Sequence, residues 1–261
     1  MFYLNGKPLK VTIFPDQTSQ VWNIPDEFFE KELGNHILWK FDSESEYLHL
    51  AQLKTLLNEI VPRSWIGLIL PYLPYARQDK EIGNNSTFAL HTFAKLLNYL
   101  NFNDVLISDP HSKVALQLIK NSRASYPKSL VLELFEEYDL LCYPDKGAVS
   151  KYTEIYSCSH MYGEKVRDQL TGKITKYEIK GQSVKDCRVL IVDDICDGGA
   201  TFVLLAKELY AHGAKEVNLF VTHGIFSKGL APLQEAGIKR IFTQDGEACK
   251  GIQNQIAYRR L

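Results

Sequence analysis

The chain has 261 residues, 45% of them hydrophobic and 23% charged, a composition typical of a folded globular protein. Thirty basic against 31 acidic side chains give a net charge of −1, so bulk charge favours neither nucleic acid nor an anionic membrane as a partner. No apolar run approaches the roughly 18 residues that a bilayer crossing needs. The start "MFYLNGKPLKV" lacks a signal-peptide pattern, and five scattered cysteines without a CxxC pair indicate reduced thiols. We therefore expect a cytoplasmic protein.

Short apolar runs alternate with longer amphipathic stretches along the chain. The run "SWIGLIL" (64–70) predicts a buried strand, and "STFALHTFAKLLNYL" (86–100) predicts a helix with Ser86 as its N-cap. "DVLISD" (104–109) predicts a further strand, followed by a helix from "SKVALQLI". These alternations indicate right-handed βαβ units, an α/β fold with mainly parallel sheets flanked by helices.

The second half of the chain repeats this theme. "DLLCY" (139–143), "RVLIVD" (188–193) and "VNLFVTH" (217–223) predict strands, and "TFVLLAKELYAHG" (201–213) predicts a helix that closes at a glycine. The pair "DVLISDPH" and "RVLIVDDI" has the same design, an apolar strand that breaks into acid. We therefore expect two similar α/β domains, residues 1–125 and 126–261.

The stretch "RVLIVDDICDGGATF" (188–202) is the most informative motif. Asp193 and Asp194 follow the apolar run, then come Asp197 and a glycine-rich turn into a helix. Backbone amides of such a turn, with the helix dipole behind them, bind phosphate, whereas carboxylates accept hydrogen bonds from sugar hydroxyls. Together they predict a ribose phosphate site. A tight turn with exposed acids is the alternative, and it would cost electrostatic repulsion without a ligand.

Several motifs resemble one enzyme family. "VLIVDDICDGGAT" resembles the phosphoribosyl-pyrophosphate loop shared by type I phosphoribosyltransferases and ribose-phosphate diphosphokinases, and "LPYLPYARQDK" (70–80) is similar to the diphosphokinase signature. The resemblance implies two domains of the type I phosphoribosyltransferase fold, an ATP-binding one truncated at its start and a ribose-phosphate-binding one. It also implies transfer of the β,γ-diphosphoryl group of ATP to the anomeric hydroxyl of ribose 5-phosphate, giving phosphoribosyl pyrophosphate and AMP, with magnesium as cofactor.

The same resemblance implies roles for individual residues. ATP would be bound by Arg77, Gln78, Asp79 and, through a looser match of "FPDQTSQVW", Phe14. The motifs "SDPHS" and "YPDKG" imply a magnesium association for His111 and Asp145. The motif "GEKVRDQ" implies a flexible catalytic loop that carries Lys165 and Arg167, and His111 is implied as a further catalytic residue. The ribose phosphate would be held by Asp193, Asp194, Asp197, Gly198, Gly199, Ala200 and Thr201.

Two departures from the family pattern leave alternatives open. The loop reads Asp-Gly-Gly-Ala-Thr where Asp-Thr-Ala-Gly-Thr is usual, so Gly198 removes a hydroxyl and opens space that could admit ADP-ribose as the acceptor, in NAD salvage. The chain is also shorter at its front than typical members, which leaves open which homo-oligomer it forms. A type I phosphoribosyltransferase and a non-catalytic partner of a synthetase remain as further alternatives.

Overall fold

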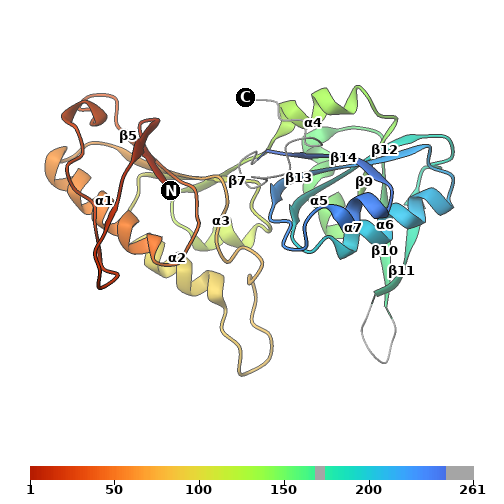
Figure 1. The fold of residues 1–261 in the computed structure, drawn as a ribbon, viewed down its shortest axis with the longest axis horizontal. Coiled ribbons are helices and arrows are strands. Elements are labelled where there is room, and N and C mark those ends of the chain that lie inside the picture. The colour runs from red at the N-terminus through yellow and green to blue at the C-terminus, as the bar shows by residue number, and fades with distance from the viewer. Residues whose placement is uncertain (168–173, 245–261) are drawn as a thin grey trace. The chain divides into compact units, whose positions relative to one another are not determined.

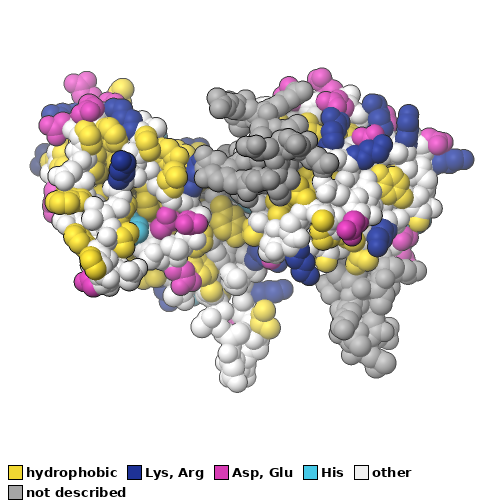
Figure 2. All heavy atoms as spheres, in the orientation of Figure 1, with side chains coloured by type: hydrophobic (Ala, Val, Ile, Leu, Met, Phe, Trp, Pro, Cys, Tyr) yellow, Lys and Arg dark blue, Asp and Glu magenta, His cyan; other side chains and the backbone are white. Residues whose placement is uncertain are grey.

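The computed structural model describes residues 1–167 and 174–244 (Figure 1). The chain divides into two compact units, Met1–Ser125 and Tyr126–Leu261, and each unit is an α/β structure built on a six-stranded sheet. On the face drawn in Figure 2, acidic and basic side chains are interspersed. Within the described ranges, no helix combines the length and apolar character that a membrane crossing requires.

The first unit is a mainly parallel sheet in the order β2-β1-β5-β6-β7-β8. Strands β5 to β8 run parallel, whereas β1 pairs antiparallel with both β2 and β5. The strands are β1 (Phe2–Leu4), β2 (Lys7–Leu9), β5 (Asn35–Trp39), β6 (Ile66–Leu70), β7 (Asp104–Ser108) and β8 (Ser122–Ser125), with a separate hairpin of β3 (Thr12–Ile13) and β4 (Ser19–Gln20). The helices are α1 (Glu46–Ile60), α2 (Ala89–Tyr99), α3 (Val114–Leu118) and the 3-10 helix η1 (Asp26–Phe28).

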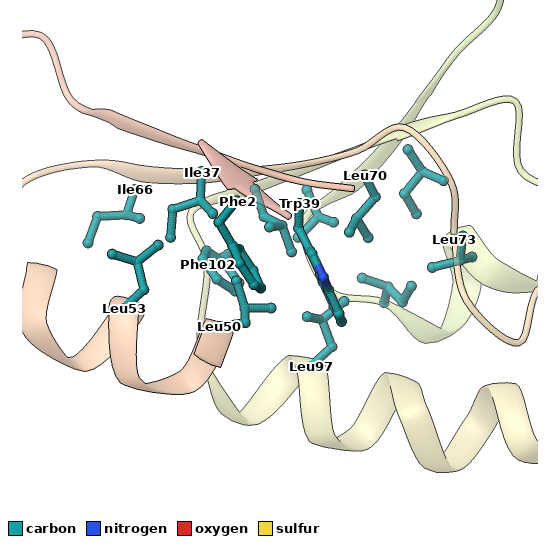
Figure 3. Close-up of a cluster of buried hydrophobic side chains, with 14 of the residues drawn as sticks. Phe2, Ile37, Trp39, Leu50, Leu53, Ile66, Leu70, Leu73, Leu97 and Phe102 are labelled. Atoms are coloured by element: carbon teal, nitrogen blue, oxygen red, sulfur yellow. The ribbon is translucent and has the colours of Figure 1, made fainter. Parts of the chain in front are cut away.

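The core of this unit lies between the sheet and helices α1 and α2 (Figure 3). Ile37 and Trp39 of β5 point toward Leu50 and Leu53 of α1, and Leu97 reaches the same cluster from α2. Each fully buried side chain of this size stabilises the fold by about 1.5–3 kcal/mol. This packing fixes strands β6 and β7, whose carboxyl ends lead into the segments that contain Arg77 and His111.

The second unit has the sheet order β11-β10-β9-β12-β13-β14, parallel except for the β10–β11 hairpin. Its strands are β9 (Leu140–Tyr143), β10 (His160–Arg167), β11 (Ile174–Gly181), β12 (Arg188–Cys196), β13 (Glu216–Gly224) and β14 (Ile238–Thr243). Its helices are α4 (Lys128–Phe135), α5 (Lys146–Tyr156), α6 (Ala200–Ala211) and α7 (Ala231–Glu235). Helices cover both faces of this sheet, as Figure 1 shows.

Alternation along β12 explains why its sequence is apolar at every position from Val189 to Val192. Val189 and Ile191 pack into the cluster beneath α6 and α7, whereas Leu190 and Val192 pack into the cluster beneath α4 and α5. A strand buried on both faces reads as a continuous apolar run. The predicted α/β class with parallel, helix-flanked sheets is therefore confirmed.

Three local predictions differ from the structure. Strand β12 continues through the acids to Cys196, because its ladder with β13 extends to the Cys196–Gly224 pair. Helix α2 begins at Ala89, and Ser86 is not its N-cap; the Ser86 hydroxyl instead accepts a hydrogen bond from the amide of Ile82 at 2.8 Å. The expected catalytic loop is strand as far as Arg167, and its residues 168–173 lie outside the described part of the chain.

Candidate active site

The turn between β12 and α6 is a tight one that ends in a left-handed glycine before the helix. Gly199 adopts a φ of 75°, and a methyl group built on it would lie 3.1 Å from Cδ2 of Leu233, so both conformation and packing favour glycine. Helix α6 begins at the next residue, and the first amides of a helix have no intrahelical acceptor. The predicted ribose phosphate residues 197–201 therefore form one turn that presents N–H groups and a helix dipole.

The two acids of the motif occupy opposite faces of β12, because side chains alternate along a strand. Asp194 is buried and forms an ion pair with Lys151 of α5, with 3.3 Å between Oδ2 and Nζ. The Lys151 side chain is only 14% exposed, which makes this pair a buried one. Asp193 accepts a hydrogen bond from the amide of Asp194 at 3.0 Å.

Asp193 is the electrostatically strained member of the site. Burial raises its pKa well above the ordinary value of 3.8, and the negative charge of Asp194 adds to this. Asp145 raises the pKa of Asp193 further, whereas Lys151 acts in the opposite direction. Asp145, Asp193 and Asp194 are thus close enough to interact electrostatically. A group of carboxylates with one buried ammonium favours a ligand that donates hydrogen bonds or carries a cation.

Asp145 sits at the start of α5, directly after strand β9. Its Oδ1 accepts a hydrogen bond from the amide of Ala148 at 3.1 Å and caps the helix, which fixes the orientation of the carboxylate. Oxygen donors of this kind suit magnesium, which is usually held by one or two carboxylates together with substrate phosphates. Within the described residues, no group of three or more His, Cys, Asp or Glu side chains is placed to hold a metal ion.

The nucleotide motif of the first unit follows β6. Leu73 and Ala76 are buried, and Tyr75 packs on Phe93 with 5.2 Å between ring centroids. The Tyr75 hydroxyl donates to Glu44 at 2.6 Å; burial and then this hydrogen bond raise the pKa of Tyr75 to about 12. The anchored loop leaves the side chains of Arg77 and Gln78 exposed.

The backbone of residues 77–79 is hydrogen-bonded to the start of helix α2. The amide of Gln78 donates to the carbonyl of Tyr75 at 2.9 Å, and the amide of Leu90 donates to the carbonyl of Gln78 at 3.2 Å. Asp79 follows at intermediate exposure. The predicted ATP-binding side chains Arg77, Gln78 and Asp79 therefore project from a fixed loop.

His111 and Phe14 lie elsewhere in the first unit. His111 is exposed in the loop between β7 and α3, close in sequence to Asp109, which is buried and has a φ of 42°. Backbone strain of this kind is frequent at functional sites, and it draws attention to Asp109, which the sequence reading did not include. Phe14 is 38% exposed beside the β3–β4 turn, where its amide donates to the carbonyl of Thr18 at 2.8 Å.

The predicted catalytic pair belongs to strand β10 of the second unit. Lys165 pairs with Tyr177 across the β10–β11 hairpin, and the ladder is irregular between Val166 and Arg167. The side chains of Lys165 and Arg167 lie outside the described part of the structure.

Two lysines of the second unit were missed by the sequence reading. Lys151 pairs with Asp194 across 43 residues of sequence, and Lys228 lies along the glycine turn. A methyl group built on Gly198 would lie 3.5 Å from Cδ and Cε of Lys228 and 3.8 Å from its Cγ. The Lys228 chain therefore borders the space that Gly198 was expected to open.

Comparison with known proteins extends these observations. A family model described as "Phosphoribosyl transferase domain" matches residues 158–253. The chain is 27% identical over 238 residues to the ribose-phosphate pyrophosphokinase of Saccharolobus solfataricus, covering 88% of this chain and 81% of the relative. It is 32% identical over 187 residues to ribose-phosphate pyrophosphokinase 2 of Archaeoglobus fulgidus, covering 69% of this chain and 68% of the relative.

The fold agrees with these sequence relationships. The crystal structure of phosphoribosylpyrophosphate synthetase from Mycobacterium smegmatis superimposes with a TM-score of 0.73 at 20% identity, over 90% of this chain and 79% of that one. The β12–α6 turn and the loop after β6 correspond to the motifs whose resemblance to this family is apparent in the sequence. The chain belongs to the ribose-phosphate pyrophosphokinase family.

Proposed function

We propose that the protein transfers the β,γ-diphosphoryl group of ATP to the anomeric hydroxyl of ribose 5-phosphate and releases AMP. The observation that carries this proposal is the combination, within one βα turn, of the Asp193–Asp194 pair and a glycine turn that opens a helix. Membership of the ribose-phosphate pyrophosphokinase family supports the same reaction.

The acceptor sugar would be held from both ends. Amides of residues 197–201 would donate to the 5-phosphate, helped by the α6 dipole and the hydroxyl of Thr201. Asp193, Asp194 and Asp197 would accept hydrogen bonds from ribose hydroxyls. Carboxylates offer acceptor oxygens and negative charge, so this group is suited to hydroxyl donors and to cations and repels phosphate, while the Lys151 ion pair limits the net negative charge at Asp194.

The nucleotide would be bound by the first unit. Arg77 offers a planar fork of donors to phosphate oxygens, and Gln78 offers an amide to a purine edge. Asp79 and Phe14 complete the proposed ATP set, with Phe14 available for stacking on a base.

For magnesium we propose Asp145 in the second unit and His111 in the first, each acting together with ATP phosphates. When bound, the ion would supply positive charge to the oxygens of the triphosphate. Asp145 is held by its hydrogen bond to the amide of Ala148, so it can act without a change of rotamer.

In the proposed step the anomeric oxygen attacks the β-phosphorus and the bond to the oxygen that bridges the α and β positions breaks. AMP leaves, and the hydroxyl proton passes to solvent; we assign no general base. Lys165 and Arg167 would stabilise the charge that develops on the transferring group. Positioning and electrostatics carry most of the rate in reactions of this kind.

An acceptor comparison tests the proposal. ATP and magnesium are supplied with ribose 5-phosphate, with ADP-ribose or with no acceptor, and AMP is measured. We expect AMP with ribose 5-phosphate above both other reactions. None of the relatives described above is named for ADP-ribose, and the Lys228 chain borders the space that Gly198 was expected to open. A clear preference for ADP-ribose would overturn the proposed acceptor.

A further inference from the structure

Lys228 lies outside every motif that suggested the function, yet its side chain runs along the glycine turn. Three of its methylene carbons, Cγ, Cδ and Cε, lie within 3.8 Å of the position that a methyl group on Gly198 would occupy. Most of the lysine side chain therefore runs beside the open position at Gly198. The ammonium is attached directly to the last of these carbons, at the turn that is proposed to hold a phosphate.

The segment that carries Lys228 is firmly attached to the same turn. The amides of Ile225 and Phe226 both donate to the carbonyl of Cys196, at 2.9 and 3.1 Å. Phe226 has a φ of 47° and its ring is buried, and the amide of Gly229 closes a tight turn onto the carbonyl of Phe226 at 2.8 Å.

A backbone anchored in this way has few conformations to lose when a ligand binds. A methyl group built on Gly224 would approach a carbon of the Phe226 ring to 2.2 Å, so the glycine and the ring are packed against each other. The position of the lysine is thus set by the fold and does not depend on a long free loop.

The charge of Lys228 is available. Lys228 is exposed, and across residues 1–167 and 174–244 its ammonium forms no ion pair with a carboxylate. Neighbouring basic groups that do form ion pairs include Lys151 with Asp194 and Lys239 with Glu216. An ammonium beside a row of backbone amides is complementary to a dianionic phosphate.

We infer that Lys228 binds the phosphate of the sugar-phosphate acceptor and is a specificity-determining residue of this enzyme. The inference rests on the proposed function, since the glycine turn must be the acceptor's phosphate site. Gly198 and Lys228 are complementary in this arrangement. A methyl group at Gly198 would stand at ordinary van der Waals distance from the lysine chain, so the chain lies next to this position, and its ammonium supplies a donor that Gly198 cannot.

The test compares Lys228→Gln and Lys228→Arg with the unaltered enzyme. Loss of a charge-assisted hydrogen bond to phosphate should raise the KM for ribose 5-phosphate about tenfold or more. We expect kcat and the KM for ATP to stay within about twofold, because only acceptor binding is affected. The Arg variant should retain most of the affinity. Lys207→Gln, which removes an exposed lysine from α6 beyond the turn, is the matched control and should change nothing.

Calorimetric binding of ribose 5-phosphate separates this inference from the proposed reaction. The Gln variant should lose affinity for ribose 5-phosphate but not for ribose, which lacks the phosphate. Equal affinity of the variant and unaltered protein for ribose 5-phosphate would overturn the inference, as would a rise confined to the KM for ATP. If the unaltered enzyme binds ribose 5-phosphate but releases no AMP, the proposed reaction fails while the binding comparison still decides the role of Lys228.

Discussion

Asp193 lowers the stability of the folded protein, although it is proposed to bind the acceptor sugar. Its pKa is raised above the ordinary value of 3.8, first by burial and then by Asp194, so the folded protein prefers the protonated form. Its contribution to stability is therefore present at acidic pH and is lost as pH rises from about 3.8 through the folded-state pKa. At pH values above that range Asp193 opposes folding.

We accordingly predict that Asp193→Asn raises Tm at pH 7, by roughly 2–4 °C for each kcal/mol of relieved repulsion. The gain should shrink toward pH 4, where Asp193 is protonated in the folded state. The KM for ribose 5-phosphate should rise in the same variant. Thermal scans at both pH values check this, and a lower Tm at pH 7 would show that Asp193 is a stabilising group.

Lys151 is predicted to support the site through Asp194. Lys151→Ala removes one partner of a buried ion pair and takes the ammonium away from the buried Asp194 carboxylate, at a cost of about 3–5 kcal/mol of unfolding free energy. Lys239→Ala is the control, because the Lys239–Glu216 pair has a similar 3.2 Å separation but a lysine that is 60% exposed; it should cost about 0–1 kcal/mol. Denaturant titration measures both.

A double variant, Lys151→Met with Asp194→Asn, separates stability from binding. It removes both charges, so it should recover part of the lost unfolding free energy while acceptor binding stays weak. Equal losses for Lys151→Ala and Lys239→Ala would show that burial does not strengthen the Lys151–Asp194 interaction.

Helix α6 offers a comparison between its two ends. Gly199 precedes the helix with a φ of 75° and Gly213 follows it with a φ of 87°. Either glycine changed to Ala should cost about 1–3 kcal/mol of unfolding free energy through backbone strain. Contact with Leu233, 3.1 Å from a methyl group at Gly199, adds to the cost there, whereas the nearest atom at Gly213 is 3.5 Å away.

Only the Gly199 variant should also weaken acceptor binding, because only that end presents amides to the proposed phosphate. The KM for ribose 5-phosphate, measured at a temperature where both variants are folded, distinguishes them. A similar rise in KM for Gly213→Ala would mean that the effect reflects loss of helix stability and not the geometry of the turn.

Strand β10 carries the proposed charge-stabilising pair. Lys165→Ala should lower kcat by about 10²- to 10³-fold, the cost of losing one transition-state donor, with little change in Tm. Lys180→Ala on the facing strand β11 is a suitable control, since Lys180 pairs with exposed Glu178 at 2.9 Å and has no proposed role. Near-normal turnover of Lys165→Ala would refute the role assigned to Lys165.

The chain as a whole shows which features a sequence can reveal. The strands β6, β7, β9, β12 and β13 could be predicted because a buried strand has apolar residues at consecutive or alternating positions of its sequence. The β1–β2 hairpin was not predicted, although Asn5 and Gly6, with φ values of 49° and 79°, form the Asn-Gly turn that favours hairpins.

Other features depend on tertiary contacts and leave little trace. The position of Ser86 in the sequence suggests an N-cap, but its hydroxyl accepts a hydrogen bond from the amide of Ile82. A serine hydroxyl can accept from a loop amide as readily as from an amide at a helix end. The residues of the glycine turn could be predicted, since they are contiguous. Lys151 and Lys228 could not, because each meets the turn or its acids from a distant part of the chain.

The most direct test of the proposed reaction follows the fate of ATP. The enzyme is incubated with ATP labelled at the γ-phosphate, magnesium and ribose 5-phosphate, and the products are separated and weighed by mass spectrometry. The proposal predicts AMP and a labelled sugar that has gained a diphosphoryl group, in equal amounts. Formation of ADP with a sugar that has gained one phosphoryl group, or AMP formation that does not depend on the sugar phosphate, would contradict it.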